Sequence, residues 1–420
     1  MKTKDFLHIA CGTLLLTGAF TFSACSTSDY YDDEIGGLDR SGAYSSSDKD
    51  GAPGEEPGEN GSQQGNNQAG IVTAGEWCDL THWPFWSKLM LSKDYTDKSE
   101  YWEFYTNNRV CVKVTDEKGT ALAGISVKLL RNNTTMWEAI TDNHGLAECW
   151  IGLYQKETAD AANLQVNVDG KIMEGHPVIC PWDSSAVEND IEAHLPTAIN
   201  HYVCTKAPKA TQQADIAFIV DATGSMADEI EFLKNDLTDI IGKVSSVRPS
   251  LTMRTAALFY RDEGDEYLTR HSDFTTDLSK TKKFVDKQKA DGGNDYPEAV
   301  HTALERTLQD LSWDNNARTR LAFLILDAPA HHEKNIIQSL QKSVANCAKQ
   351  GIRLIPVAAS GVDKNTEFML RFFSIATGGT YVFITNDSGV GNDHIAASVG
   401  HYEVELLNQL IIRLIDYYTE

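Results

Sequence analysis

Three oxygen-bearing side chains follow an apolar run in the stretch DIAFIVDATGSM. The run IAFIV (216–220) ends at Asp221, and the hydroxyls of Thr223 and Ser225 follow at intervals of two residues. Carboxylate and hydroxyl oxygens are ligands that Mg²⁺, Mn²⁺ and Ca²⁺ prefer, whereas zinc favours nitrogen and sulfur. Because the D-x-T-x-S spacing would put all three donors on one tight turn after a strand, it predicts a divalent-cation site.

Two other segments carry compatible ligands. Asp327 directly follows the apolar run RLAFLIL (320–326), and the stretch DGGNDYPE contains Asp291, Asn294 and Asp295. In open α/β sheets, ligands bind beyond the carboxyl ends of the strands. A bare group of carboxylates at that edge would repel itself, and a hard cation relieves the repulsion. We therefore expect the three segments to converge on one ion.

The same residues also allow other interpretations. Asp221 could merely cap a helix whose first turn contains Ser225 and Asp228, which would leave an empty acidic rim. Asp221 and Asp327 could instead flank a substrate as an acid–base pair. The sequence has no GxSxG, and no GxGxxG follows the first strand of this region, so hydrolase and dinucleotide motifs are missing. A cation site accounts for the acids of all three segments.

The elements that position these residues occupy 213–420. Apolar runs at 216–220, 254–260, 320–326, 353–358 and 380–384 alternate with amphipathic stretches such as PEAVHTALERTLQDL. Continuous apolar strands separated by helices predict a parallel sheet that is buried on both faces. The expected fold is therefore an α/β Rossmann-like doubly wound domain. The polar stretch TRHSDFTTDL is predicted to be a solvated loop.

A different periodicity precedes this domain, over 71–205. An aromatic-rich segment, AGEWCDLTHWPFWSKLM, is followed from Arg109 by short alternating runs such as RVCVKVTD and LQVNVDG, with turn signals between them. This pattern predicts an antiparallel β-sandwich, on which the aromatic rings are expected to pack. Two disulfides are possible in this region, Cys111–Cys149 and Cys180–Cys204, whereas Cys347 lies on a helical stripe and should be buried.

The first residues, 1–25, have the features of a targeting signal. Lys2 and Lys4 precede an apolar stretch too short for a membrane span, and Ser23-Ala24-Cys25 resembles a bacterial lipobox. That resemblance implies lipidation of Cys25 and an anchor in a membrane. Residues 26–70 are rich in Gly, Ser, Glu and Gln and are predicted to be a disordered linker. The expected location is that of an outer-membrane lipoprotein, and the acidic run after Cys25 resembles a surface-export tag.

The charge of the chain limits its partners. The formal net charge is -23, and nucleic-acid binding requires a basic face to meet the phosphates. We therefore expect no nucleic acid among its partners. A strongly acidic protein remains compatible with cations and with basic partners.

The stretch DATGSM, with LDAPAH downstream, resembles a von Willebrand factor type A domain carrying a metal-ion-dependent adhesion site, DxSxS…T…D. The resemblance covers about 213–420. The matching residues are Asp221, Thr223 in place of the first serine, Ser225 and Asp327. At the threonine position stands Gly-Gly-Asn294-Asp295-Tyr-Pro-Glu, which resembles the GGGDxPE variant of bacterial and alpha-kinase-linked type A domains. The resemblance implies that Asp295 takes the place of the threonine as a metal ligand, with Asn294 as the alternative.

This resemblance implies a recognition role rather than catalysis. In that family the cation is held partly by protein and partly by water, and a partner's carboxylate completes its shell. The chain is accordingly predicted to be an envelope-anchored binding protein, not an enzyme. It would use a divalent cation, expected to be Mg²⁺, to engage a protein or other acidic ligand in adhesion or surface-complex assembly. The alternatives are a structural envelope component with an enclosed metal, and a metal-assisted enzyme or enzyme accessory.

A second resemblance concerns about 109–150. The pattern VxVxDxxGxxLAGxxVxL…TDxxGxA resembles carboxypeptidase-regulatory-like and bacterial Ig-like modules. Such modules usually act as spacers or stabilisers, which is the role expected for this region.

Overall fold

The computed structural model describes residues 69–182, 198–205, 211–228, 230–293, 295–391 and 393–420. The predicted signal peptide with Cys25, nearly all of the linker 26–70, and Asn294 lie outside the described residues.

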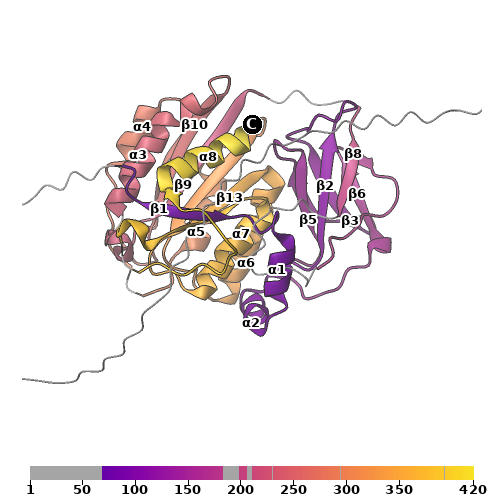
Figure 1. Cartoon of the computed structure of the whole chain (residues 1–420), viewed down its shortest axis with the longest axis horizontal. Helices are drawn as coiled ribbons and strands as arrows, with labels where there is room; N and C mark the ends of the chain where they lie inside the picture. The colour runs from indigo at the N-terminus through magenta and orange to yellow at the C-terminus, as the bar shows by residue number, and fades with distance from the viewer. Residues whose placement is uncertain (1–68, 183–197, 206–210, 229, 294, 392) are drawn as a thin grey trace, which may run out of the picture. The chain divides into compact units, whose positions relative to one another are not determined.

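The largest sheet has eight strands in the order β11-β10-β9-β12-β13-β14-β1-β15 (Figure 1). Their bounds are β1 Thr73–Trp77, β9 Gln213–Asp221, β10 Thr252–Tyr260, β11 Thr269–Thr275, β12 Thr319–Leu326, β13 Ile352–Ala358, β14 Tyr381–Ile384 and β15 Glu405–Leu406. The neighbours from β10 to β14 pair in parallel, and the order reverses between β9 and β12. The predicted doubly wound α/β sheet, with its five apolar strands, is confirmed.

Helices cover both faces of this sheet (Figure 1). Their bounds are α3 Ile230–Val247, α4 Leu278–Val285, α5 Val300–Gln309, α6 Lys334–Gln350, α7 Lys364–Thr377 and α8 Leu407–Thr419. Alternation along β9 divides its side chains between the two faces. Phe218 belongs to the apolar cluster with α3 and α8, whereas Ile219 belongs to the cluster with α5, α6 and α7.

The stretch predicted as a solvated loop is instead an edge strand, β11, which pairs antiparallel with β10. Its side chains are exposed or half-buried, as in Arg270 and Phe274. Polar residues on an edge strand protect it from pairing with other chains. Because such a strand lacks an apolar run, the sequence pattern did not predict it.

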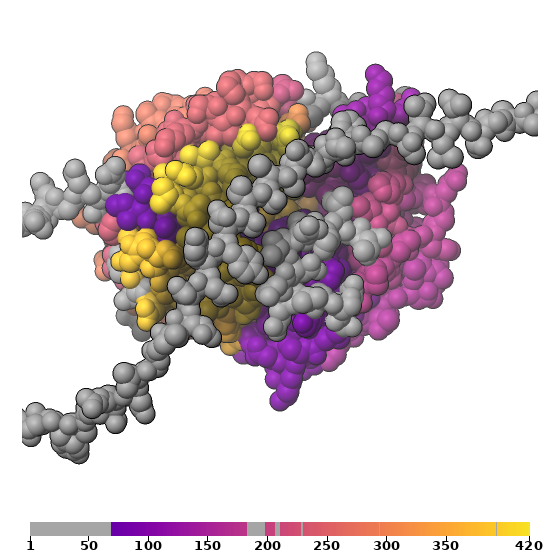
Figure 2. All heavy atoms as spheres, in the orientation of Figure 1, coloured from indigo at the N-terminus to yellow at the C-terminus, as the bar shows by residue number. Residues whose placement is uncertain are grey.

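The aromatic-rich segment contributes to the large sheet. β1 pairs antiparallel with β14 and β15, so this part of 71–205 belongs to the sheet formed mainly by 213–420. Figure 2 shows the indigo surface of the first described residues beside the yellow surface of α8, which contacts β1.

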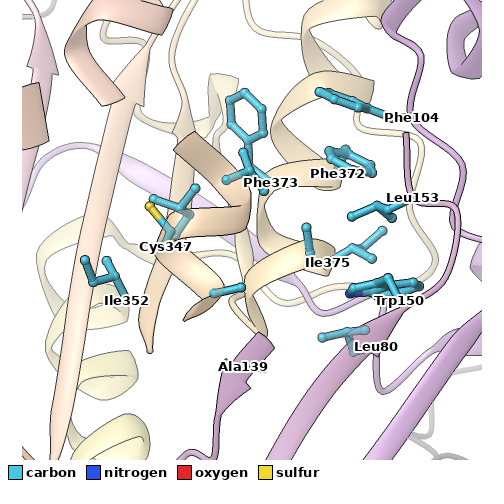
Figure 3. Close-up of a cluster of buried hydrophobic side chains, with 14 of the residues drawn as sticks. Leu80, Phe104, Ala139, Trp150, Leu153, Cys347, Ile352, Phe372, Phe373 and Ile375 are labelled. Carbon is cyan, nitrogen blue, oxygen red and sulfur yellow. The ribbon is translucent and has the colours of Figure 1, made fainter. Parts of the chain in front are cut away.

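The two helices that follow, α1 (Trp83–Met90) and α2 (Lys93–Trp102), bring aromatic rings against α7. Trp86 stacks on Phe368 with ring centroids 5.9 Å apart, and Phe104 stacks on Phe372 at 3.7 Å (Figure 3). The same cluster includes Trp150 of β5 and Leu153, which follows that strand. The rings therefore pack on α7 as well as on the sheets that follow them.

Two smaller sheets lie between β1 and β9 in the sequence, in the orders β5-β2-β8 and β4-β3-β6-β7. Their bounds are β2 Arg109–Thr115, β3 Ser126–Arg131, β4 Thr134–Ile140, β5 Leu146–Trp150, β6 Leu164–Val168, β7 Lys171–Ile172 and β8 Ile199–Val203. The pair β2–β8 is parallel and the other pairs are antiparallel. The expectation of a purely antiparallel sandwich is therefore wrong for β8.

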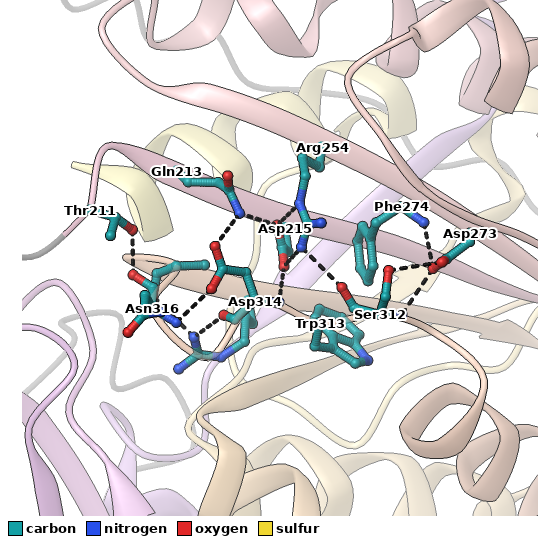
Figure 4. Close-up of polar contacts among 12 residues, drawn as sticks. Thr211, Gln213, Asp215, Arg254, Asp273, Phe274, Ser312, Trp313, Asp314 and Asn316 are labelled. Carbon is teal, nitrogen blue, oxygen red and sulfur yellow. Dashed lines mark hydrogen bonds and ion pairs between the residues drawn. The ribbon is translucent and has the colours of Figure 1, made fainter.

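A buried polar network fixes the start of β9 (Figure 4). Asp215 has no exposed surface, and Arg254 of β10 donates to both of its oxygens at 2.8 and 2.6 Å. The backbone N–H of Asp314 donates to the same carboxylate at 2.8 Å. Because a buried carboxylate is tolerated only when paired, this network ties β9 to β10 and to the loop before β12.

The cysteines confirm one expectation and overturn another. Cys347 is fully buried in α6, as predicted. Cys111, Cys149 and Cys180 are free thiols, so neither of the two disulfides considered from the sequence is present. Within the described part of the chain, no helix has the length and apolar character needed to cross a membrane.

A buried ion pair joins the N-terminal segment to α7. Arg371 donates to both oxygens of Asp79 at 2.9 and 2.6 Å, and neither side chain is exposed. The guanidinium also donates to Tyr95 at 3.0 Å and lies over the ring of Trp86. Arg371 therefore links α7 to the strand–helix segment that precedes the smaller sheets.

Replacing Arg371 with methionine should lower the free energy of unfolding by about 3–5 kcal/mol, because it leaves the Asp79 carboxylate buried without its partner. The measurement is urea denaturation of the purified chain. The control Lys93→Met removes an exposed ion pair with Asp97 and should cost at most about 1 kcal/mol. Equal losses of unfolding free energy in the two variants would contradict a special role for the buried pair. Adding Asp79→Leu to Arg371→Met should restore part of the lost free energy, because it removes the unpaired carboxylate.

Candidate metal centre

The register of the parallel strands brings two of the predicted ligands to one edge of the sheet. Val220 of β9 lies opposite Ile325 of β12, so Asp221 at the end of β9 and Asp327 just after β12 leave the sheet at the same edge. Both are almost fully buried, with 0% and 3% of their surface exposed. They lie where the strand order reverses, which is the usual binding position in this class of fold.

The turn after β9 holds the other two ligands of the first motif. The backbone N–H and the hydroxyl of Thr223 donate to the same oxygen of Asp221 at 2.9 and 2.7 Å. The hydroxyls of Thr223 and Ser225 are hydrogen-bonded, 3.2 Å apart. Thr223 is buried, whereas Ser225 is exposed at the start of the 3-10 turn η2 (Gly224–Asp228). The turn therefore carries a buried hydroxyl oxygen, that of Thr223, and an exposed one, that of Ser225.

The glycine pair of DGGNDYPE lies directly over this turn. The N–H of Gly224 donates to the carbonyl of Gly292 at 2.9 Å, and the N–H of Asp291 donates to the carbonyl of Ala222 at 3.0 Å. Gly292 and Gly293 both have positive φ, 81° and 68°, a conformation that glycine adopts without strain.

Of the two residues considered for the third position, Asp295 is exposed and Asn294 lies outside the described residues. The assignment of a ligand to either of them stays a prediction.

Glu298, in the same segment, is the ligand candidate that the sequence analysis missed. It is 1% exposed, and its backbone N–H donates to the carbonyl of Pro329 at 2.8 Å, next to the Asp327 loop. A methyl group built on Gly293 would lie 2.7 Å from Oε1 of Glu298 and 3.0 Å from Cβ of Thr223. Glu298 and Thr223 therefore both press against Gly293, which puts the Glu298 carboxylate beside the first motif.

Asp262 and Asp265 were missed as well. They follow β10, where Asp262 is buried and the Asp265 carboxylate accepts the N–H of Gly293 at 3.0 Å and that of Asp262 at 3.1 Å. Tyr260, the last residue of β10, lies opposite Asp221 in the sheet. The rule used for Asp221 and Asp327, that acids at the end of an apolar strand reach the binding edge, would have pointed to Asp262, two residues after β10, but not to Asp265, five residues after it.

The adjacent histidines His331 and His332 point in different directions. Nε2 of His331 lies 2.8 Å from Oδ1 of Asp262, whereas His332 stacks on Tyr101 of α2 with ring centroids 3.5 Å apart. His331 therefore orients one acid of the site, and His332 joins the site's rim to the N-terminal segment.

Burial and nearby charges raise the pKa values of two acids of the site, Asp221 and Glu298. Burial raises the pKa of Asp221 to about 6, despite the hydrogen bonds from Thr223. Burial, followed by the nearby charges of Asp221, Asp262, Asp327 and Asp265, raises the pKa of Glu298 to about 9. The buried acids therefore favour a proton, or another positive charge, among them.

Two buried carboxylate oxygens at this edge lack a hydrogen bond, Oδ2 of Asp221 and Oε2 of Glu298. The Tyr260 hydroxyl, which lies near Asp221, also lacks a partner. Unsatisfied buried polar atoms are costly, and a hard cation accepts such oxygens as ligands.

The described acids do not form a cage on their own. Within the described ranges, no three His, Cys, Asp or Glu side chains are arranged to hold an ion by themselves. Hydroxyls and waters would therefore have to complete the shell, as suits Mg²⁺, which keeps several of its waters. The donor set fits a hard divalent cation.

The fold and the site define an open α/β domain with oxygen donors at its switch point. Residues 215–355 match the family model described as the von Willebrand factor A domain, so the chain contains a domain of this family. The resemblance inferred from the sequence motifs is thereby confirmed for the domain.

Two curated proteins are similar over parts of the chain. The alpha-protein kinase vwkA of Dictyostelium discoideum is 27% identical over 179 residues, 42% of this chain and 28% of the kinase. An ariadne-like RING finger protein of Acanthamoeba polyphaga mimivirus is 28% identical over 130 residues, 31% of this chain and 12% of that protein. The matched regions thus span well under two thirds of either relative.

Solved structures show weaker likeness. The protein BatB from Bacteroides thetaiotaomicron is 12% identical, with a TM-score of 0.33 and coverage of 49% of this chain and 98% of its own. Proximal thread matrix protein 1 of the mussel byssus, with a zinc-occupied MIDAS motif, is 16% identical, with a TM-score of 0.36 and coverage of 49% and 46%.

Without metal, the midpoint temperature of thermal unfolding should fall as the pH rises from about 5 to about 8. The pKa of Glu298 is raised from 4.5 to about 9 in the folded state, so the folded chain binds a proton that the unfolded chain releases, and this stabilisation is lost as pH rises through that window. The measurement is thermal unfolding in a chelator at several pH values.

Glu298→Gln should flatten this pH dependence, whereas Glu117→Gln, at an exposed turn, should leave it unchanged. Adding Mg²⁺ should stabilise the wild type more at higher pH, because ion and proton compete for the same oxygens. A wild-type midpoint that is independent of pH over this range would contradict the raised pKa of Glu298.

Proposed function

We propose that this domain binds a hard divalent cation and uses it to engage a carboxylate-bearing protein partner. The supporting observation is the pair of buried carboxylate oxygens without a hydrogen-bond partner, on Asp221 and Glu298, at the switch point of the sheet. The ion would be held by Asp221, Thr223 and Ser225 of the first turn. Asp327 and Glu298 would face it from the neighbouring segments, and Asp295 remains a candidate ligand of the same loop.

The choice of ion follows from the donor types. All of these side chains offer carboxylate or hydroxyl oxygen, which favours Mg²⁺, Mn²⁺ or Ca²⁺ over softer metals. Mg²⁺ is the ion we propose, because it keeps bound waters that a ligand can replace. When bound, the ion supplies an open coordination position for a partner's carboxylate.

The residues of the site would bind and orient the ion rather than transfer protons. The Asp221 oxygen that accepts from Thr223 is fixed by two hydrogen bonds. His331 and the N–H groups around Asp265 hold the outer acids in place. Ser225 is exposed, so one donor faces the side from which a partner would approach. We propose a binding module, not an enzyme.

We further propose that the chain is anchored to the cell envelope through a lipid on Cys25, with residues 26–70 as a spacer. The proposal rests on the lipobox-like Ser23-Ala24-Cys25 and on the composition of the segment that follows. An outer-membrane lipoprotein with the binding domain held away from the bilayer would suit adhesion or the assembly of a surface complex. Mass spectrometry of the purified N-terminus would detect the lipid, and an unmodified Cys25 would overturn this part of the proposal.

Calorimetric titration with Mg²⁺, Mn²⁺ and Ca²⁺ should show saturable binding that Asp221→Ala abolishes. Glu298→Gln should weaken the affinity by about 10–100-fold, as for groups that tune a metal site, and should have a larger effect than Asp295→Asn because Asp295 is exposed. The control Asp277→Asn neutralises an acid that caps α4 and keeps the capping function, so it should bind as the wild type does. Absence of binding to the wild type would overturn the proposed function.

A further inference from the structure

A small cavity adjoins the metal-site turn on the side of β10. It has a volume of about 210 Å³ and lies between the residues after β10 and those after α4. Its lining includes Arg261, Tyr267, Arg270, Lys287 and Lys289. Pockets for drug-sized ligands are about 300–1,000 Å³, so this one would hold a single side chain or a comparable group.

One arginine ties this cavity to the metal-site turn. Nε of Arg261 donates to the carbonyl of Ala222 at 3.1 Å, and an Nη2–H donates to the carbonyl of Lys289 at 2.9 Å. Ala222 stands between two of the predicted ion ligands, Asp221 and Thr223, and its carbonyl also accepts the N–H of Asp291. The cavity therefore backs directly onto the turn that would hold the ion.

The cavity is positively charged in an otherwise acidic chain. Its four basic residues face two acids, Glu266 and Asp291, which leaves a surplus of two positive charges in a protein whose formal net charge is -23. The two acids lie 3.9 and 3.8 Å from Nη1 of Arg261, beyond hydrogen-bond distance, and their side chains are 69% and 79% exposed. The side chain of Arg261 is only 5% exposed, so a buried guanidinium turns one nitrogen toward two acids to which it is not hydrogen-bonded. Glu266 instead accepts a hydrogen bond from Arg270 at 3.0 Å.

An aromatic ring holds two of the guanidinium groups in place. Arg261 lies over the ring of Tyr267 at 4.5 Å from its centroid, and Arg270 lies over it at 3.8 Å. Stacking of this kind orients an arginine without neutralising its charge. Nη1 of Arg261 stays available for an anion, whereas Nη2 of Arg270 donates to Glu266 at 3.0 Å. The lysines after α4 are exposed beside them.

We propose that this cationic pocket binds a second carboxylate of the same acidic protein segment whose first carboxylate meets the ion. The inference rests on the proposed function and specifies its ligand: a segment with two acidic side chains, one for the ion and one for the pocket. Arginine forks match carboxylates in two parallel hydrogen bonds, and the volume admits one such group. An ion surrounded by several carboxylates attracts an acidic partner weakly, and the pocket supplies the missing attraction.

The test uses the purified chain and a fluorescein-labelled hexaglutamate peptide, with hexaglutamine as the uncharged probe, in fluorescence anisotropy titrations. The pocket variant is Arg270→Gln with Lys289→Gln, which leaves the buried Arg261 untouched. The control is Lys280→Gln with Lys283→Gln, which removes the same charge from exposed positions of α4. Each protein is measured with saturating Mg²⁺ and with a chelator, and Mg²⁺ binding is measured by calorimetry.

In saturating Mg²⁺, we expect the wild type to bind hexaglutamate and not hexaglutamine. The pocket variant should bind hexaglutamate about tenfold more weakly, or about 1.4 kcal/mol, and the control less than about twofold more weakly. Mg²⁺ affinity should be the same in all three proteins.

Equal weakening by the pocket variant and the control would overturn the pocket, because general charge would then explain the loss. Magnesium-dependent peptide binding that the pocket variant leaves unchanged would also overturn it, while the proposed function would stand. Absence of hexaglutamate binding to the wild type would overturn the pocket too, and the calorimetric titration would show separately whether the ion site exists.

Discussion

The rest of the domain depends on the register of β9 within the large sheet. The strand carries an aspartate near its start and one at its end. Asp215 is buried and fully paired with Arg254 and the loop before β12, whereas Asp221 keeps one oxygen without a partner. A slip of one residue would turn every side chain of β9 to the opposite face and break the pairing of Asp215. The satisfied carboxylate thereby fixes the position of the unsatisfied one, and Tyr260 and Asp327 come beside it from the neighbouring strands.

The N-terminal segment makes the large sheet depend on parts of the chain that are far apart in sequence. β1 pairs with β14, after which the chain forms the smaller sheets and returns as β9. The smaller sheets are therefore an insertion between two strands of one sheet, not a module that merely precedes it. The buried pair of Arg371 and Asp79 and the stacking of Phe104 on Phe372 hold this connection together.

The sequence predicted the features that follow from local pattern. Five apolar strands, their helices and the edge where Asp221 and Asp327 meet follow from the buried runs IAFIV and RLAFLIL. β1 was missed because TAGEW has no apolar alternation and gains its place only by pairing with β14. β11 was missed because edge strands are polar. Glu298 was missed because its burial depends on the packing of Gly293 against Thr223, which no spacing rule encodes. Asp262, two residues after β10, lay within reach of the rule applied to the other strands.

The acids missed from the sequence change how the site must work. Asp221, Asp262, Glu298 and Asp327 are more carboxylates than a divalent ion can neutralise. Burial, followed by the neighbouring charges, raises the pKa of Glu298 to about 9 before any ion is bound. An ion in such a site is held firmly but has little net positive charge left for an acidic partner. The positive charge of Arg261 offsets part of this negative charge. Arg261 is buried, donates to the carbonyl of Ala222, and lines the cavity beside the turn. The cation and the guanidinium would therefore act as one electrostatic unit, with the carboxylates fixing the ion and the arginine restoring the attraction for an anionic ligand.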